Sequence, residues 1–334
     1  MDHNDNTSSN GNGRPTSPSP SLYSFHSSVD ERIILREMYG RILNNQNDTY
    51  FLPADHEEHR RLDLQHHIYT LMLGDLYPAG SLVRKALRPR ANRRPKVLDI
   101  GTGSGRWVID MAKEFPHCDV VGVDLAPPRL EGEAPSNCRF EIDDANLGFA
   151  HFRQQFDVVH ARATSMGIRD YPAFLKELAL TLRPGGVLLL GEGEMQLYDE
   201  QRRPLSFSEV TSSWIERVFF AGYNAVKTRG GSIDASAMTP SWLRSIDSLI
   251  DVGWAKAFIP IGPWIYANER DRVLAEMLRT NCLQYISGLI PLLLSDGYLP
   301  ESVEKMKREA TAELQELRVN IYSRWSFAWA IKKP

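Results

Sequence analysis

A glycine-rich turn preceded by an acid is the most chemically specific stretch of the sequence. The segment Asp99-Ile100-Gly101-Thr102-Gly103-Ser104-Gly105 follows an apolar run and precedes a helical pattern, which is the context of a nucleotide-binding turn. Glycines at such a turn allow positive φ angles and bring the backbone close to a ligand. Residue 106 is arginine, so the third glycine of a dinucleotide fingerprint is missing, and no P-loop Gly-Lys-Ser/Thr follows. The spacing weighs against both of these nucleotide sites.

Acidic residues end the next two apolar runs. Asp124 closes "DVVGVDL", 19 residues after Gly105, where a carboxylate can accept both hydroxyls of a ribose. Asp143 and Asp144 follow the third run, in "EIDDAN". Ligands of open α/β sheets bind at the carboxyl ends of the strands. One of these two acids, followed by Ala145, can therefore meet an adenine amino group; a solvated turn or a helix cap is the alternative.

The elements that must position these residues alternate between residues 96 and 190. The runs "KVLDI", "DVVGVDL", "CRFEI", "FDVVHA" and "GVLLLGE" are short and aliphatic or β-branched, as central parallel strands are. Between them, "GRWVIDMAKEF" and "YPAFLKELALTL" have helical spacing. The alternation predicts a doubly wound α/β sheet.

The flanking segments have other patterns. Residues 1–28 are rich in Ser, Asn, Gly and Pro, and we predict that they are disordered. Residues 29–95 form an N-terminal helical lid, with a helical pattern up to Tyr77, and a basic connector, "RKALRPRANRRPK", that is either a nuclear-localisation patch or a solvated linker.

Past residue 190 we expect helical segments and two strands. One helix, near 206–229, carries Val210 and Trp214 on one face, and another begins with Thr239 as N-cap and Pro240 in its first turn. Residues 268–318 predict two further helices, separated at "SDGYLPES". A strand is expected in "WAKAFIPI", and a half-buried antiparallel strand in "SRWSFAWAI".

The overall composition excludes several classes of protein. A net charge of −3 over 334 residues argues against a dedicated nucleic-acid binder. The three cysteines form no CxxC pair and no secretory signal is visible, so we expect a cytoplasmic or nuclear protein. The apolar stretch "YISGLIPLLL" is too short to span a bilayer. The segment "DHEEH" lacks the spacing of HExxH, so no metal site is predicted.

Five motifs occur in a characteristic order. They are "VLDIGTGSG", "VVGVDL", "FEIDDAN", "FDVVHAR" and "LRPGGVLLLGE". Together they resemble class I S-adenosylmethionine-dependent methyltransferases. The stretches "YFLPADHEEHRRLDLQHHIYTLML", "FIPIGPW" and "YSRWSFAWAIKKP" are similar to the LaeA-like (UMTA or TAM-domain) fungal methyltransferases. The resemblance implies a Rossmann-like, seven-stranded, mostly parallel sheet with an antiparallel last strand. It also implies a methyltransferase domain over 96–334, with helical cap insertions at about 206–229 and 268–318.

The resemblance implies S-adenosylmethionine as cofactor and a role for each matching residue. The glycine turn would line the methionine, with Asp99 holding the turn or reaching the cofactor's amino group. Asp124 would bind the ribose hydroxyls, and Asp144 with Ala145 the adenine edge. Tyr50, in "YFLP", would close over the cofactor. The full implied set is Tyr50, Asp99, Gly101, Thr102, Gly103, Gly105, Asp124, Leu125, Asp143, Asp144, Ala145 and His160.

Methyl transfer requires few catalytic groups from the protein. An acceptor atom must be aligned with the sulfonium methyl and water excluded, and a base is needed only for a poor nucleophile such as a hydroxyl. His160, at the end of "FDVVH", is the candidate base; shaping the cofactor pocket is its alternative role. Arg162 can pair an acceptor carboxylate and Glu192 can face the acceptor. Trp214 and Tyr223 can line an apolar acceptor cavity or belong to the core.

Two functions fit these observations. The first is an enzyme that methylates an O, N or carboxyl group of a small-molecule fungal secondary metabolite, with no membrane or direct nucleic-acid partner. A homodimer or a velvet-type regulatory partner is the candidate protein assembly. The second is a nuclear regulator, because LaeA-like proteins are associated with velvet-type complexes that control metabolite clusters. A nicotinamide oxidoreductase is disfavoured by the position of the third glycine.

Overall fold

The computed structural model describes residues 31–130 and 132–334, so the predicted disordered segment 1–28 lies outside the described residues. Its centre is a seven-stranded sheet in the order β5-β4-β3-β6-β7-β9-β8. Strands β3 to β7 are parallel, whereas β9 is antiparallel to both β7 and β8. The predicted Rossmann-like sheet with an antiparallel last strand is confirmed. The strands are β3 (Lys96–Ile100), β4 (Asp119–Asp124), β5 (Cys138–Ile142), β6 (Phe156–Arg162), β7 (Leu182–Tyr198), β8 (Leu249–Pro260) and β9 (Tyr322–Lys332).

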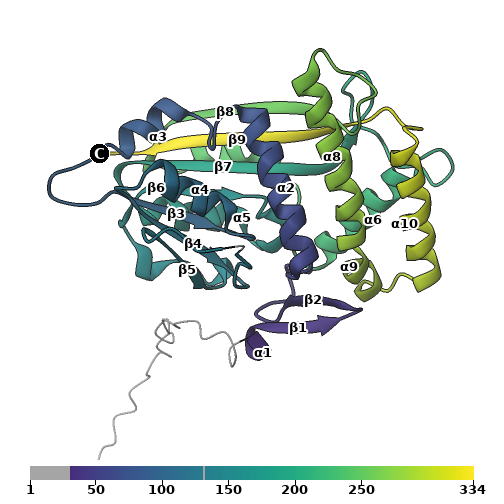
Figure 1. Ribbon diagram of the computed structural model, residues 1–334, viewed down its shortest axis with the longest axis horizontal. Coiled ribbons are helices and arrows are strands. Elements are labelled where there is room, and N and C mark those ends of the chain that lie inside the picture. Colours follow the sequence, from purple (N-terminus) through teal and green to yellow (C-terminus); the bar gives the residue numbers. More distant parts are fainter. Residues whose placement is uncertain (1–30, 131) are drawn as a thin grey trace, which may run out of the picture.

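Helices cover the sheet and extend past one end of it. Figure 1 shows the long strands β7, β9 and β8 running toward α6, α8 and α10. In the part of the chain that the structure describes, no helix is long and apolar enough to cross a membrane. The helices are α1 (Glu31–Ile34), α2 (His56–Leu73), α3 (Gly80–Ala86), α4 (Arg106–Glu114), α5 (Tyr171–Thr181), α6 (Trp214–Thr228), α7 (Ala235–Arg244), α8 (Glu269–Gly288), α9 (Ile290–Ser295) and α10 (Pro300–Gln315).

Both faces of the parallel strands are buried. Val97 and Val158 belong to the apolar cluster with α3 and α4, whereas their neighbours Leu98 and Val159 belong to the cluster with α5 and α7. This alternation follows from the pleat of a strand, which turns successive side chains to opposite faces. Covered on both sides, these strands end at one rigid edge, where the acids predicted from the sequence lie.

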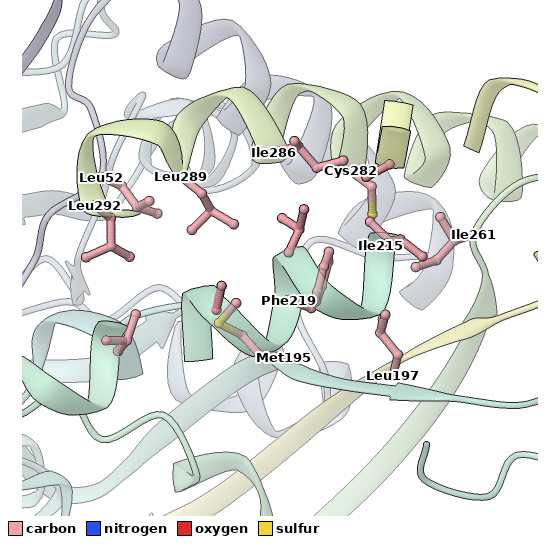
Figure 2. Packing of buried hydrophobic residues seen from close by; sticks show 14 of the residues in the cluster. Leu52, Met195, Leu197, Ile215, Phe219, Ile261, Cys282, Ile286, Leu289 and Leu292 are labelled. Carbon is pink, nitrogen blue, oxygen red and sulfur yellow. The ribbon is translucent and has the colours of Figure 1, made fainter. Parts of the chain in front are cut away.

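A second core joins the helical layer to the extended part of β7. Figure 2 shows Ile215 and Phe219 of α6 facing Cys282 and Ile286 of α8, with Met195 of β7 beside them. Burying each large apolar side chain contributes about 1.5–3 kcal/mol. The cluster therefore fixes α6 and α8 relative to the sheet.

The segment before α2 departs from the predicted helical pattern. Strands β1 (Leu35–Met38) and β2 (Arg41–Asn44) form an antiparallel hairpin. Its turn, Tyr39 and Gly40, has positive φ angles at both residues, which a two-residue hairpin turn requires and a helix does not allow. The helical prediction holds from residue 56, where the Asp55 side chain caps α2.

The predicted start of α6 is wrong. The helix begins at Trp214 rather than near residue 206, and Val210 is exposed in the loop before it. Ser213 and Glu216 form a capping box, in which each side chain accepts from the other residue's backbone N–H. These bonds satisfy backbone N–H groups at the start of the helix that have no partner within it, and so define where the helix begins.

One proline lies elsewhere than predicted, and another divides a predicted helix. Thr239 and Pro240 are inside α7, whose N-cap is Asp234, and the Thr239 hydroxyl donates to the Ala235 carbonyl. Pro291 lies in the first turn of α9, so the predicted first helix of 268–318 is divided into α8 and α9. Proline has no N–H to donate to the preceding turn, which favours a new helix there.

The last strand is antiparallel as predicted, but it is not half-buried. β9 lies between β7 and β8, and Ala328 and Ala330 are buried on the face opposite Trp329 and Ile331. The second buried face consists of small residues such as Ala328 and Ala330, which alternate with the aromatic residues and gave a weaker apolar signal.

A buried ion pair within α2 includes the arginine that joins this helix to α8. Arg61 Nη2 donates to Glu58 Oε1 at 2.7 Å, and the two side chains are 4% and 2% exposed. Arg61 Nη1 also donates to Asn281 Oδ1 at 3.3 Å, and Asn281 Nδ2 donates back to the Arg61 carbonyl. The second glutamate of "DHEEH" thus belongs to a structural ion pair in the first turns of α2.

Candidate functional site

A cavity opens at the carboxyl ends of β3, β4, β5 and β6. Because these strands are parallel neighbours, their last residues meet at one edge. The predicted residues that line the cavity are Tyr50, Asp99, Gly101, Thr102, Gly103, Asp124, Leu125, Asp143, Asp144, Ala145, His160 and Arg162.

The glycine turn forms the floor between β3 and α4. Gly101 and Gly103 have φ angles of 71° and 56°, which glycine adopts without strain. A Cβ on Gly101 would lie 2.7 Å from Thr164 Cγ2, and one on Gly103 would lie 2.9 Å from Leu62 Cδ1. Neither position therefore has room for a side chain. A turn whose backbone contacts a ligand directly has the same requirement.

Gly105 does not line the cavity. It is the N-cap residue of α4, with φ of 79°, and a Cβ there would lie 2.9 Å from the Phe140 ring. The absence of a side chain at Gly105 allows the chain to pass from the turn into α4 and allows α4 to pack against β5. The sequence motif does not distinguish a glycine that caps the helix from a glycine that contacts the ligand, because both conformations need a positive φ angle.

Asp124 presents a carboxylate to the cavity and forms no ion pair within the described residues. Its Oδ2 accepts from the Gly103 N–H at 2.7 Å and its Oδ1 from the Ala126 N–H at 3.3 Å. Burial raises the pKa of Asp124 to about 6 despite these donors. Each carboxylate oxygen keeps a lone pair, so the group is suited to accept hydroxyl donors from a ligand.

The acids after β5 are tied to the segment between the hairpin and α2. Asp144 Oδ1 accepts from the Asn146 N–H and side-chain amide, and its Oδ2 accepts from Asn47 Nδ2 at 2.9 Å. Asp143 Oδ1 accepts from the Asp144 N–H, and burial raises the pKa of Asp143. Residues 45–55, which include Tyr50 in the cavity wall, are thereby fastened to the end of β5.

His160 and Asp99 form a hydrogen-bonded pair across β6 and β3. The two residues are in register, and His160 Nδ1 lies 2.7 Å from Asp99 Oδ1. The imidazole stacks on the Trp107 ring, with centroids 4.0 Å apart. Burial lowers the pKa of His160 against the opposing effect of Asp99. The pairing assigns the proton to Nδ1 and leaves Nε2 as the basic nitrogen.

Glu192 does not line the cavity. Its carboxylate is buried below the loop that follows β6 and accepts from the backbone N–H of Thr164, from Ser165 Oγ and from Tyr171 Oη. Burial raises its pKa, and these donors oppose the rise. Thr164 is itself in the cavity wall. Glu192 thus holds a wall of the site in place rather than facing an acceptor.

We expect Glu192→Gln to lower the free energy of unfolding by about 1–3 kcal/mol, since the amide leaves buried donors unpaired. Its affinity for an adenosyl ligand should fall as well, because the Thr164 loop loses its anchor. Urea denaturation and ligand titration check both effects. Glu200→Gln, on the exposed turn after β7, is the control and should change stability by less than about 0.5 kcal/mol. Equal stability of the two variants would contradict the anchoring role.

Trp214 and Tyr223 lie on α6, away from the cavity lining. The Trp214 ring is covered by Arg217 and Lys305, and the Tyr223 hydroxyl lies 3.0 Å from Asp234 Oδ2. The helical spacing correctly indicated an apolar face on α6. That face packs against the second core and does not line an acceptor site.

Several cavity residues escaped the sequence analysis. Leu62 and Gln65 reach the cavity from α2, and Trp107 from the first turn of α4. Trp107 could have been found, because it lies in the first helical turn after the glycine-rich segment. Leu62 and Gln65 had no such signal, since only the tertiary packing of α2 brings them to the edge of the sheet. The other unpredicted residues are Ile100, Ser104 and Val123 on β3, the glycine turn and β4, and Asn146, Ala163, Thr164, Gly167 and Ile168 after β5 and β6.

Comparison with known proteins identifies the family. A family model described as a methyltransferase domain matches residues 65–212. The secondary metabolism regulator laeA of Coprinopsis cinerea is 35% identical over 292 residues, which cover 86% of this chain and 72% of that protein. The chain belongs to the LaeA-like methyltransferase family. It is an S-adenosylmethionine-dependent methyltransferase with the Rossmann-like fold that this family's motifs predicted.

Other LaeA-like and methyltransferase chains match less closely. Methyltransferase pytC of Aspergillus terreus is 28% identical over 290 residues, covering 86% of this chain and 84% of that protein. A solved structure of Haemonchus contortus phosphoethanolamine N-methyltransferase 2, with phosphomonomethylethanolamine and S-adenosylhomocysteine, is 19% identical. Its TM-score is 0.46, and the match covers 82% of this chain and 58% of that one.

Proposed function

We propose that this LaeA-like enzyme methylates an O, N or carboxyl group of a small-molecule fungal secondary metabolite. The cavity at the sheet edge carries the proposal, because the acceptor must reach the methyl group inside it rather than on a flat surface. Residues 45–55 support it by covering one side of the cavity: Asn47 bonds Asp144, and Arg169 Nε donates to Thr49 Oγ1 at 2.7 Å. A covered cavity suits a small molecule better than a folded protein.

The order of groups along the sheet edge suits the cofactor. We place adenine beside Asp143, Asp144 and Ala145 after β5, the ribose hydroxyls on Asp124 after β4, and the methionine over Gly101 and Gly103 after β3. Thr102 and Leu125, which also line the cavity, complete this placement. The Asp124 carboxylate, which has no counter-ion within the described residues, is the kind of group that a polar ligand satisfies.

S-adenosylmethionine supplies an electrophilic methyl group on a positively charged sulfur. The protein's part is to align the acceptor and exclude water, and alignment alone can contribute about 7–11 kcal/mol. We assign His160 the role of general base for a hydroxyl or ammonium acceptor. Its low pKa keeps the imidazole neutral, and Asp99 orients it and would stabilise its protonated form.

We expect the affinity for S-adenosylhomocysteine to fall as the pH drops below about 6, the pKa of Asp124 in the free protein. Ribose hydroxyls donate to the ionised carboxylate, so binding below this pKa requires loss of a proton. The dissociation constant should rise about tenfold per pH unit below the pKa and stay constant above it. Calorimetric titration across this range checks the profile. Asp124→Asn should bind weakly with no such step, and a flat wild-type profile would contradict the assignment.

A regulatory role is the second candidate, because the relative from Coprinopsis cinerea is called a secondary metabolism regulator and is 35% identical to this chain. In this role the protein would act in the nucleus with a velvet-type partner, or as a homodimer. In the first role it would act in the cytoplasm on its metabolite. The two roles differ in where the methyl group goes.

Transfer of a labelled methyl group separates the candidates. The protein would be incubated with methyl-labelled S-adenosylmethionine and a fungal metabolite extract, followed by separation of small molecules from protein. We expect label in the small-molecule fraction, and none with the Asp124→Asn variant. Label confined to protein, or no transfer although the cofactor binds, would contradict the metabolite enzyme and favour the regulator.

A further inference from the structure

Arg162 is a cation in the cavity wall that has no carboxylate partner within the described residues. It ends β6, is part-buried and lines the cavity. Its guanidinium lies 4.3 Å from the centroid of the Tyr69 ring, and its Nη2 lies 3.2 Å from His66 Nδ1. Neither contact neutralises the charge. A part-buried guanidinium without an anion is unfavourable, so this side of the cavity is suited to an anionic group of a ligand.

A relay from two helices holds Arg162 in this position. His66 of α2 accepts from Arg162 through Nδ1, while its Nε2 lies 3.1 Å from Asp110 Oδ2 of α4. Since Arg162 can only donate, the imidazole must carry its proton on Nε2 and donate it to Asp110. Burial lowers the pKa of His66, which keeps it neutral and able to accept from the guanidinium.

The register of the sheet places Arg162 beside the glycine turn. Asp99 pairs with His160 and Ile100 with Ala161, so the next residues along are Gly101 and Arg162. The strand order β5-β4-β3-β6 follows the order of adenine, ribose and methionine in the placement proposed above. The methionine's charged end then comes to β6.

We infer that Arg162 binds the carboxylate of the cofactor's methionine, and that His66 and Asp110 position its guanidinium. The inference rests on the proposed cofactor placement and replaces the expectation that Arg162 pairs an acceptor carboxylate. His66 and the Tyr69 ring hold the Arg162 guanidinium in one orientation. Its remaining N–H donors are therefore available to a single anion, and a carboxylate can accept two of them at once.

The test compares two ligands that differ in the amino-acid part. S-adenosylhomocysteine carries the carboxylate, and 5′-methylthioadenosine lacks the whole amino-acid group. In Arg162→Met we expect affinity for the first to fall roughly 10- to 100-fold, as for loss of a charge-assisted pair, and affinity for the second to stay within about twofold. Arg162→Lys should fall between, because it keeps the charge but not the fork. Arg153→Met, an exposed arginine, is the control and should bind both ligands as the wild type does.

The relay has its own readout. His66→Leu should lower the preference for S-adenosylhomocysteine over 5′-methylthioadenosine, and should add little in the Arg162→Met background, because coupled residues act non-additively. Unchanged S-adenosylhomocysteine binding by Arg162→Met would overturn the inference, and pairing with an acceptor carboxylate would again be the expected role of Arg162. Equal loss of both ligands would overturn it in favour of a structural role. Failure of the wild type to bind either ligand would instead overturn the cofactor placement itself.

Discussion

Asp124→Asn is expected to bind S-adenosylhomocysteine roughly 100- to 10,000-fold more weakly than the wild type, because it weakens two charge-assisted hydrogen bonds of about 1.5–3 kcal/mol each. The substitution keeps the shape of the side chain but removes the charge that accepts the ribose hydroxyls. In the free protein that charge has two backbone donors and no cation beside it. Calorimetric titration at neutral pH measures the loss.

A matched control lies on the same strand. Asp119 begins β4, at the opposite end from Asp124, and pairs with Arg94 at 2.6 Å on the surface. Asp119→Asn makes the same chemical change and should leave the affinity unaltered. Thermal unfolding of both variants shows whether each is folded. An Asp124→Asn variant that is folded and binds within about threefold of wild type would refute the ribose assignment.

Arg61→Met should lower the free energy of unfolding by about 3–5 kcal/mol, since it leaves Glu58 as an uncompensated buried charge. The Glu58 side chain is 2% exposed, and Arg61 supplies its donors from the same helix. The loss should loosen α2, which carries Leu62 and Gln65 into the cavity. Chemical denaturation measures the change in stability.

The double variant Glu58→Leu/Arg61→Met tests the reason for this loss. Replacing both partners by apolar residues of similar volume is often neutral or stabilising, whereas removing one is not. We therefore expect the double variant to be more stable than Arg61→Met alone. If the double variant is no more stable than the single one, the cost comes from lost packing or from Asn281, and not from the unpaired charge.

The central sheet was predictable because its signal is local. Strands buried on both faces are continuous apolar runs such as "KVLDI", and five of these runs form β3 to β7 in the predicted order. The acids that end them lie at the cavity because parallel strands share an edge. The hairpin β1–β2 was missed, since its register depends on positive φ at Tyr39 and Gly40, and a tyrosine gives no sign of that conformation.

The acceptor side of the site was less predictable because its residues depend on tertiary packing. Glu192 follows an apolar strand as Asp124 does, yet its side chain turns to the loop donors of Thr164 and Ser165. Trp214 and Tyr223 have the helical spacing of a cavity wall as well as that of a core face. A sequence pattern gives the face that is buried but not the partner against which it is buried.

The most direct test of the account is a titration of the wild-type protein with S-adenosylmethionine, S-adenosylhomocysteine and NAD. The cavity at Asp124, with its glycine turn, predicts binding of both adenosyl ligands with dissociation constants on the order of micromolar. It predicts no binding of NAD. Binding of NAD, or absence of adenosyl binding by folded protein, would contradict the assignment of this cavity as the cofactor site.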